Sequence, residues 1–216
     1  MARDSREFTA TAVRRAAEDG ITQFLDLGCG YPPRRGTAIH DIARSVTPAA
    51  RVAHVDIDQD AAAYSSWRYH HELGLQGISV TCADLRDAGA VLAAPEVRAV
   101  ISPAGPLRVV GAMTLHFMAP ADAAAAAAAY MARCAPGSIL AATVSRNDDP
   151  VRWEQVSAAW SASTGTPIFN FTRAGFAGLE IAVAPVAGPR GSVHVLGGAG
   201  RKPAHYPVPP PLRPGS

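Results

Sequence analysis

Cysteine, lysine and net charge are all scarce in this chain, and each scarcity excludes a class of function. The 216 residues include three cysteines, which are scattered and show no paired metal-ligand spacing. Such a set indicates reduced thiols, so we expect a cytoplasmic protein with no metal site. The formal net charge is only +2, which gives no electrostatic basis for binding nucleic acid or an anionic membrane.

Long apolar segments are also missing. No apolar run reaches the ~20 residues needed to cross a bilayer, and the charged start of the chain lacks the apolar core of a signal peptide. A chain of 216 residues suits one domain with a sizeable core. We expect that domain over residues 1–203, followed by a proline-rich tail over 204–216 that is extended or disordered.

Three strand-like runs each end in residues suited to ligand binding. The first has Asp26 just before a turn that contains Gly28 and Gly30, and the next two close with Asp56 and Asp84. In an open parallel sheet, ligands bind in the crevice at the carboxyl ends of the strands. Glycine lets the backbone approach a ligand closely, Asp56 can accept hydrogen bonds from a ribose diol, and Asp84 from an exocyclic amine. The pattern predicts a nucleoside site, although the two glycines alone also fit an ordinary strand-to-helix turn.

The glycine spacing argues against a dinucleotide. A dinucleotide fingerprint needs a third glycine three places after the second, and Pro33 stands there. A pyrophosphate seated on a helix N-terminus is therefore not expected, which disfavours a nicotinamide-dependent oxidoreductase. A nucleoside without phosphate fits better, and S-adenosylmethionine is the ligand that this pattern favours.

Strand-like and helix-like segments alternate along the chain. Helices are predicted at 5–18, 37–46, 59–73, 87–93, 120–134 and 150–163. Strands are predicted at 22–27, 51–56, 78–83, 107–113, 138–144, 179–183 and 192–196. The proline-containing stretch between 94 and 106 is expected to be irregular. This alternation predicts an α/β domain with a doubly wound, mostly parallel, seven-stranded sheet and helices on both faces.

Several segments carry a resemblance to one known family. They are 20–33, 39–43, 55–58, 83–87, 115–117, 136–138, 176–180 and 197–202. Together they resemble, over residues 6–203, the class I S-adenosyl methyltransferases of high-GC bacteria that were once described only as a domain of unknown function. The resemblance implies a single Rossmann-like domain that uses S-adenosyl-L-methionine and releases S-adenosyl-L-homocysteine.

The chain departs from this family in ways that bear on the site. Family members carry an N-terminal arm before the first helix, whereas this chain starts almost at that helix. We therefore expect an open cofactor site, or one that a second copy of the chain or another partner covers. The turn after Gly30 is longer and carries Arg34 and Arg35, and Ala38 replaces the family's asparagine.

The resemblance also implies which residues hold the cofactor. Its amino-acid end would lie by Asp26, Gly28 and Gly30, and its ribose would lie by Asp56 and Ile57. Its adenine would lie by Asp84 and Leu85. Asp58 could support Asp56, although capping of the following helix is the simpler expectation.

A catalytic base is needed only where the acceptor is protonated or weakly nucleophilic, because methyl transfer depends mainly on alignment. His116 follows the fourth predicted strand and is the candidate base; its alternatives are packing beside Phe117 or lining the cofactor. His40 could touch the amino-acid end of the cofactor, cap its helix or face solvent. Trp160 is expected to pack rather than to line a site.

The sequence thus predicts a methyltransferase that acts on a small-molecule acceptor, without nucleic-acid or membrane partners. The alternative is a regulatory or partner-dependent protein that binds S-adenosylmethionine or S-adenosylhomocysteine without transferring the methyl group.

Overall fold

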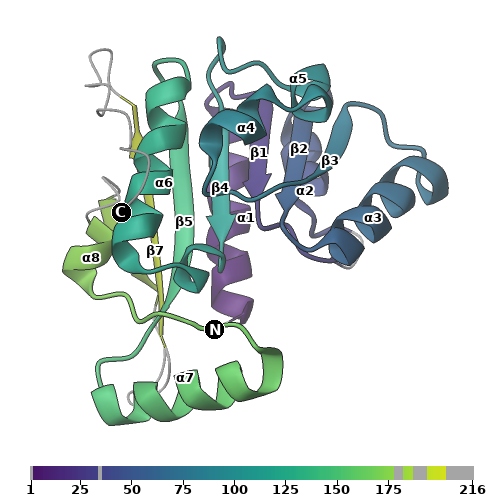
Figure 1. The fold of residues 1–216 in the computed structure, drawn as a ribbon. Helices are drawn as coiled ribbons and strands as arrows, with labels where there is room; N and C mark the ends of the chain where they lie inside the picture. Colours follow the sequence, from purple (N-terminus) through teal and green to yellow (C-terminus); the bar gives the residue numbers. More distant parts are fainter. Residues whose placement is uncertain (1, 34–35, 178–181, 187–193, 203–216) are drawn as a thin grey trace.

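A single mixed sheet organises the protein. The computed structural model describes residues 2–33, 36–177, 182–186 and 194–202. The strands of these residues are β1 (Gln23–Leu27), β2 (Arg51–Asp56), β3 (Ile78–Cys82), β4 (Arg108–Ala112), β5 (Ile139–Arg146), β6 (Ala182–Val186) and β7 (His194–Arg201). They lie in the order β3-β2-β1-β4-β5-β7-β6 (Figure 1). Strands β1 to β5 are parallel, and β7 and β6 continue the sheet in antiparallel fashion.

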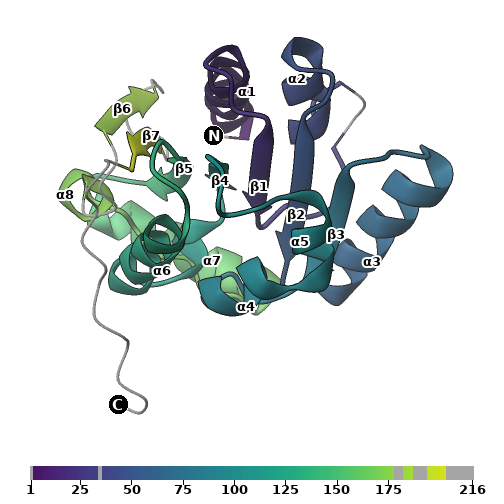
Figure 2. The ribbon, with the colours of Figure 1, turned by 90° about the horizontal axis from the view of Figure 1, so that it is seen from above.

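Helices cover both faces of this sheet. The helices of the described residues are α1 (Ala2–Glu18), α2 (Ile39–Val46), α3 (Gln59–Trp67), α4 (Ala88–Ala93), α5 (Pro95–Val100), α6 (Pro120–Arg133), α7 (Pro150–Thr164) and α8 (Arg173–Ala177). Seen from above, α1 and α2 lie on one face, and α4, α5 and α6 lie on the other (Figure 2). The predicted α/β class and the doubly wound, mostly parallel sheet are confirmed, with five strands in its parallel part.

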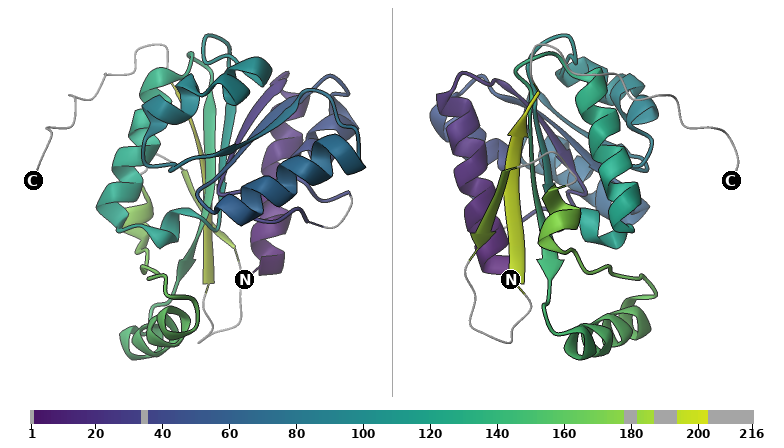
Figure 3. Two further views of the ribbon diagram at one scale, coloured as in Figure 1. Left: turned by 45° about the vertical axis from the view of Figure 1, so that its right-hand side comes forward. Right: turned by 90° about the vertical axis from the view of Figure 1, so that its left-hand side faces the viewer.

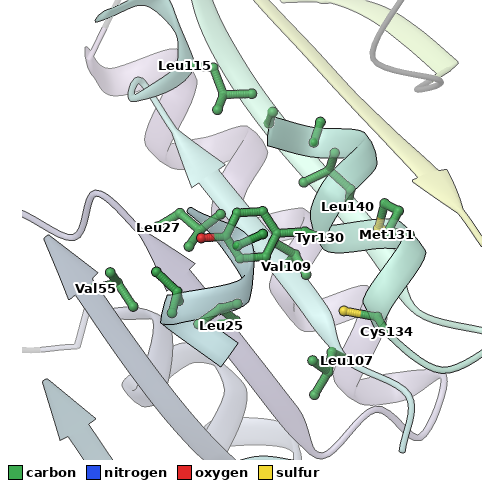
Figure 4. Close-up of a cluster of buried hydrophobic side chains, with 14 of the residues drawn as sticks. Leu25, Leu27, Val55, Leu107, Val109, Leu115, Tyr130, Met131, Cys134 and Leu140 are labelled. Carbon is green, nitrogen blue, oxygen red and sulfur yellow. The ribbon is translucent and has the colours of Figure 1, made fainter. Parts of the chain in front are cut away.

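The two faces of each parallel strand bury different side chains, because successive residues in a strand point to opposite sides. In β1, Phe24 packs towards α1 and α2, whereas Leu25 and Leu27 pack towards α6. Figure 4 shows Leu25, Leu27, Val109 and Tyr130 gathered between the sheet and α6. The alternation continues to the carboxyl end of β1, so Asp26 points to the same face as Phe24.

Helix α7 differs from the other long helices in that none of its residues is buried. It stands apart from the sheet, beyond the end of β5 (Figure 3). Local caps hold its ends. The carboxylate of Asp149 accepts hydrogen bonds from Val151 N and Arg152 N at 3.0 and 3.1 Å, and Gly165 ends the helix with φ 71°.

Several predicted boundaries are wrong. The stretch expected to be irregular contains α5, because Pro95 occupies the first turn of a helix, where its missing N–H costs nothing. The helix predicted over 59–73 ends at Trp67 and continues as a π-helical turn, Arg68–Glu72, which buries Tyr69.

The end of the chain was also predicted incompletely. Helix α8 was not expected, and β6 extends to Val186, past the predicted end at 183; the predicted start at 179 lies outside the described residues. Strand β7 runs on through a glycine-rich segment because all eight of its residues pair with β5. Arg34 and Arg35, the predicted boundary at 203 and the predicted tail at 204–216 also lie outside the described residues.

A matched pair of valine substitutions tests which elements contribute most to the free energy of unfolding. Val109 in β4 is fully buried, whereas Val151 in α7 is 64% exposed. Val109→Ala should lower the free energy of unfolding by about 2–4 kcal/mol, because it removes two buried methyl groups and leaves a cavity. Val151→Ala should change it by less than about 0.5 kcal/mol. Denaturant unfolding of both variants measures the difference, and equal losses would contradict this description of the core.

Candidate functional site

Two hollows open near the carboxyl ends of β1, β2 and β4, and both are lined by Gly28. The larger, called here the large cleft, has a volume of about 520 Å³. The smaller, called the small pocket, has a volume of about 160 Å³. Sites for small molecules usually have volumes of roughly 300–1,000 Å³, so the large cleft is of a size for such a ligand.

The large cleft has two unlike sides. One side carries the ends of β2 and β3 and consists of Asp56, Ile57, Asp58, Asp84, Leu85 and Arg86. The other side is formed after β4 and by α7 with the residues that follow it, and consists of Met113, Thr114, Phe117, Met118, Trp160, Thr164 and Thr166. Gly28 and Gly30 follow β1, which lies between β2 and β4 in the sheet, and they also line the cleft.

Gly28 is required by a close approach between β1 and the segment after β4. A Cβ atom on residue 28 would lie 2.3 Å from Oγ1 of Thr114. That hydroxyl donates to the carbonyl oxygen of Leu27 at 3.1 Å, and Gly28 N donates to the carbonyl oxygen of Val55 at 2.8 Å. With φ at +71°, residue 28 also has a backbone conformation that favours glycine.

Asp56 holds the glycine turn in place. Its Oδ2 accepts a hydrogen bond from Gly30 N at 2.6 Å, and its Oδ1 accepts one from Asp58 N at 3.0 Å. Each carboxylate oxygen has further acceptor capacity, so Asp56 can still receive hydroxyl donors from the cleft. Asp58 caps α3 through Asp60 N and Ala61 N, which confirms the capping role predicted for it.

Asp84 lines the large cleft but is already paired. Arg86 Nε lies 3.0 and 2.8 Å from the two oxygens of Asp84. The hydrogen bond from Arg86 holds the pKa of Asp84 below its usual value. An exocyclic amine would therefore compete with this guanidinium for the carboxylate, whereas Leu85 and the exposed Ile57 offer apolar contact.

Asp26 faces the small pocket and not the large cleft. It is 8% exposed, and its Oδ2 lies 2.8 Å from Nδ1 of His54. Cys29 lines the same pocket, and burial, followed by the charges of Asp26 and Asp56, raises the pKa of its thiol. A raised pKa keeps the thiol protonated near neutral pH, and the protonated form is not the nucleophile.

His40 neither caps its helix nor faces solvent, so these two alternatives predicted from the sequence are wrong. It is 3% exposed and lies against His54, with Nδ1 3.2 Å from Nε2 of that residue. It does not line the small pocket. Among the described residues, no group of three or more His, Cys, Asp or Glu side chains could hold a metal ion, and no described helix has the length and apolarity to cross a membrane.

His116 lies in a short 3-10 turn, Leu115–Phe117, where its side chain is 4% exposed. Its ring packs on Phe117 at 4.5 Å between centroids, and burial lowers its pKa to about 4. Phe117 and Met118 line the large cleft, but His116 does not. The geometry thus matches the packing alternative, and a base role for His116 stays a prediction without structural support.

The aromatic side of the large cleft was not predicted from the sequence. Trp160 was expected to pack, yet it is 41% exposed and lines the large cleft, with its ring 6.1 Å from that of Phe117. Met113 lines the same side with φ at +56°, and its N–H lies 3.0 Å from the carbonyl oxygen of Thr143. No local signal distinguishes Trp160 from a core residue, because its position depends on where α7 lies.

The comparisons with known proteins agree with this geometry. The family described as S-adenosyl methyltransferase matches residues 1–182. A putative methyltransferase from Thermobifida fusca YX shares 27% identity and a TM-score of 0.79, covering 93% of this chain and 81% of that chain. A DUF574 family protein from Streptomyces avermitilis MA-4680 shares 26% identity and a TM-score of 0.79, covering 93% and 83%.

A more distant structure shows the same fold with a ligand. The N-methyltransferase NodS from Bradyrhizobium japonicum WM9, in complex with S-adenosyl-L-homocysteine, shares 16% identity and a TM-score of 0.54, covering 92% of this chain and 87% of that chain. No curated protein matches closely enough to count as a relative. The match over most of its length shows that this chain belongs to the S-adenosyl methyltransferase family, with the class I fold and S-adenosyl-L-methionine as its cofactor.

Proposed function

We propose that this protein transfers the methyl group of S-adenosyl-L-methionine to a small-molecule acceptor bound against the aromatic side of the large cleft. The observation that carries the proposal is that Gly28 lines both hollows, so one ligand can extend across the glycine turn from one to the other. A cofactor with an amino-acid end and a nucleoside end fits two hollows that share a lining residue in this way.

The cofactor residues proposed from the sequence divide between the hollows. Asp26, by the small pocket, would receive the ammonium group, and Asp56, in the large cleft, would receive the ribose hydroxyls. Ile57 and Leu85 would flank the adenine, with Asp84 on its polar edge next to Arg86. Gly28 and Gly30 would let the ligand lie close to the backbone.

The acceptor would meet the methyl group between Met113, Phe117 and Trp160. Among the cleft-lining residues that the structure describes, Arg86 is the one cationic side chain, and Asp84 pairs with it. An anionic acceptor would therefore find no unpaired cation on that lining. An acceptor with an uncharged, apolar body suits this side, since aromatic and thioether side chains offer contact area and exclude water.

The bound cofactor supplies an activated methyl group on a sulfonium, and the protein has to align an acceptor atom with it. Alignment alone can contribute several orders of magnitude in rate. A nucleophile that is already unprotonated needs no base, which fits a cleft whose lining includes no histidine among the described residues.

Asp56→Asn tests the cofactor site. The substitution keeps the size of the side chain but removes its charge and one acceptor oxygen. Hydrogen bonds to charged groups contribute about 1.5–3 kcal/mol, so we expect S-adenosylhomocysteine to bind about ten to a hundred times more weakly, measured by calorimetric titration. Asp60→Asn is the matched control, because Asp60 is exposed on α3 and does not line the cleft. Unchanged affinity in Asp56→Asn would contradict the ribose assignment.

Trp160→Ala tests the acceptor side. Labelled methyl transfer to a bacterial metabolite extract, fractionated by polarity, should recover an acceptor in an uncharged, apolar fraction. Removing the indole should lower kcat/KM for that acceptor by at least about tenfold, because burying an aromatic side chain contributes about 1.5–3 kcal/mol. The affinity for S-adenosylhomocysteine should stay within about twofold.

Trp67→Ala is the control, because Trp67 is 51% exposed and does not line the cleft. Loss of cofactor affinity without loss of transfer in Trp160→Ala would assign the aromatic side to the cofactor instead. Absence of any methylated product would refute transfer to a small molecule.

A further inference from the structure

Three buried polar side chains form a line at the small pocket, which Asp26 and His54 both line and His40 does not. Asp26 Oδ2 lies 2.8 Å from His54 Nδ1, and His54 Nε2 lies 3.2 Å from His40 Nδ1. The exposed fractions of the three residues are 8%, 1% and 3%. Most buried polar side chains have a hydrogen-bond partner, and this line of partners ends at the proposed ammonium site. The name histidine dyad is used below for His54 and His40.

All three residues of this line lie in regular secondary structure: Asp26 in β1, His54 in β2 and His40 in α2. Asp26 and His54 are direct neighbours in the parallel pairing of β1 with β2, so their side chains share one face of the sheet. Helix α2 covers that face and brings His40 onto His54. The ring of Tyr69 packs on both imidazoles, at 4.7 and 5.2 Å between centroids.

The hydrogen-bond pattern restricts the proton states of the dyad. An ionised carboxylate only accepts hydrogen bonds, so Nδ1 of His54 must carry a hydrogen. In neutral His54 the other nitrogen then accepts, and Nδ1 of His40 donates to it. In protonated His54 both nitrogens donate, and Nδ1 of His40 accepts. In both states every one of these hydrogen bonds has a donor and an acceptor, and the two states differ by one proton next to Asp26.

The second histidine stays neutral in either state. Burial, and after it the neighbouring His54, lowers the pKa of His40 to about 4. If both rings were protonated, two N–H donors would face each other across 3.2 Å. His40 is therefore neutral above a pH of about 4, and the carboxylate of Asp26, 2.8 Å from His54 Nδ1, favours any added proton on His54.

We propose that His54, backed by His40, positions Asp26 for the cofactor's ammonium group and sets the negative charge that Asp26 presents to it. This inference rests on the proposed function. With a neutral dyad, Asp26 contributes a full negative charge to the small pocket. With a protonated dyad, the adjacent positive charge cancels it, so cofactor affinity falls as the pH decreases through the titration of the dyad.

Other charged groups surround the dyad. Asp41 of α2 has Oδ1 3.8 Å from His40 Nε2, Arg44 of α2 is close enough to His40 to help lower its pKa, and Arg6 of α1 lines the small pocket. Burial and the charge of Asp26 raise the pKa values of Tyr69 and Cys29, so both stay neutral. Histidine is the side-chain type whose charge ordinarily changes near neutral pH, and His40 stays neutral there because its pKa is lowered to about 4.

Two substitutions of His54 separate its two roles. In His54→Asn the amide Nδ2 replaces Nδ1 as the donor to Asp26 but does not titrate. In His54→Leu the donor is lost. Affinity for S-adenosylhomocysteine is measured by calorimetry at several pH values between about 5 and 8, and thermal unfolding confirms that each variant is folded. His70→Asn is the matched control, because His70 is exposed.

The wild-type protein and His70→Asn should bind about tenfold more weakly at pH 5 than at pH 8, the size of one charge interaction of about 1.4 kcal/mol. His54→Asn should bind within about threefold of wild type at pH 8 and show a flat profile, since a retained donor preserves the hydrogen bond. His54→Leu should bind about tenfold more weakly at pH 8.

The proposal would be overturned if the affinity of His54→Asn depended on pH as that of the wild-type protein does. It would also be overturned if His54→Leu bound with wild-type affinity. If His54→Leu does not fold, the comparison of His54→Asn with wild type decides alone. If the wild-type protein binds the cofactor at no pH, the proposed function fails, and imidazole nitrogen NMR of the ligand-free protein tests the dyad separately. At pH 8, His54 should carry its hydrogen on Nδ1, and hydrogen on Nε2 instead would refute the proposed line.

Discussion

The site depends on one close contact, the packing of Thr114 against the backbone at Gly28. The side chain of Thr114 occupies the position that a side chain of residue 28 would need, at 2.3 Å from the Cβ that is missing there. Its hydroxyl bonds to the end of β1, while Gly28 N bonds to Val55 O in β2. The ends of three strands are therefore fixed to one another at a single residue, and both hollows open from that residue.

The parts of the fold that local pattern dictates could be predicted. Alternating helices and strands indicate a parallel sheet, and the ends of parallel strands meet at one edge, so Asp56, Asp84 and the glycine turn were found from sequence. Asp58 was predicted as a cap because N-capping is a local property. Helix α5 was missed, since a proline that begins a helix looks the same in sequence as one that prevents it.

The parts that depend on long-range placement could not be predicted. Trp160 lines the cleft because of where α7 lies, and nothing within its own helix records that. His40 lies 14 positions before His54 in the sequence, and the two meet only because α2 folds back over β2. One signal was present and was not used: His54 is a polar residue inside the apolar run of a central strand, where a polar side chain has to find a partner.

Helix α7 is held less firmly than the strand ends on the opposite side of the large cleft. The proposed cofactor side is built from the ends of β2 and β3, whereas part of the opposite side comes from a helix without a buried residue. Elements with few buried contacts open and move at low free-energy cost. An acceptor that packs on Trp160 and Phe117 would add apolar contact to a helix that local caps otherwise hold.

The distribution of charge in the large cleft has a consequence for turnover. The carboxylates of Asp56 and Asp58 accept backbone N–H groups, and that of Asp84 is paired with Arg86, so the acidic side is organised before any ligand arrives. If the cofactor binds as proposed, methyl transfer would remove the positive charge of the sulfonium, and with it part of the attraction to these carboxylates and to Asp26. The same carboxylates would then hold the charged cofactor more strongly than its product, whose sulfur is neutral.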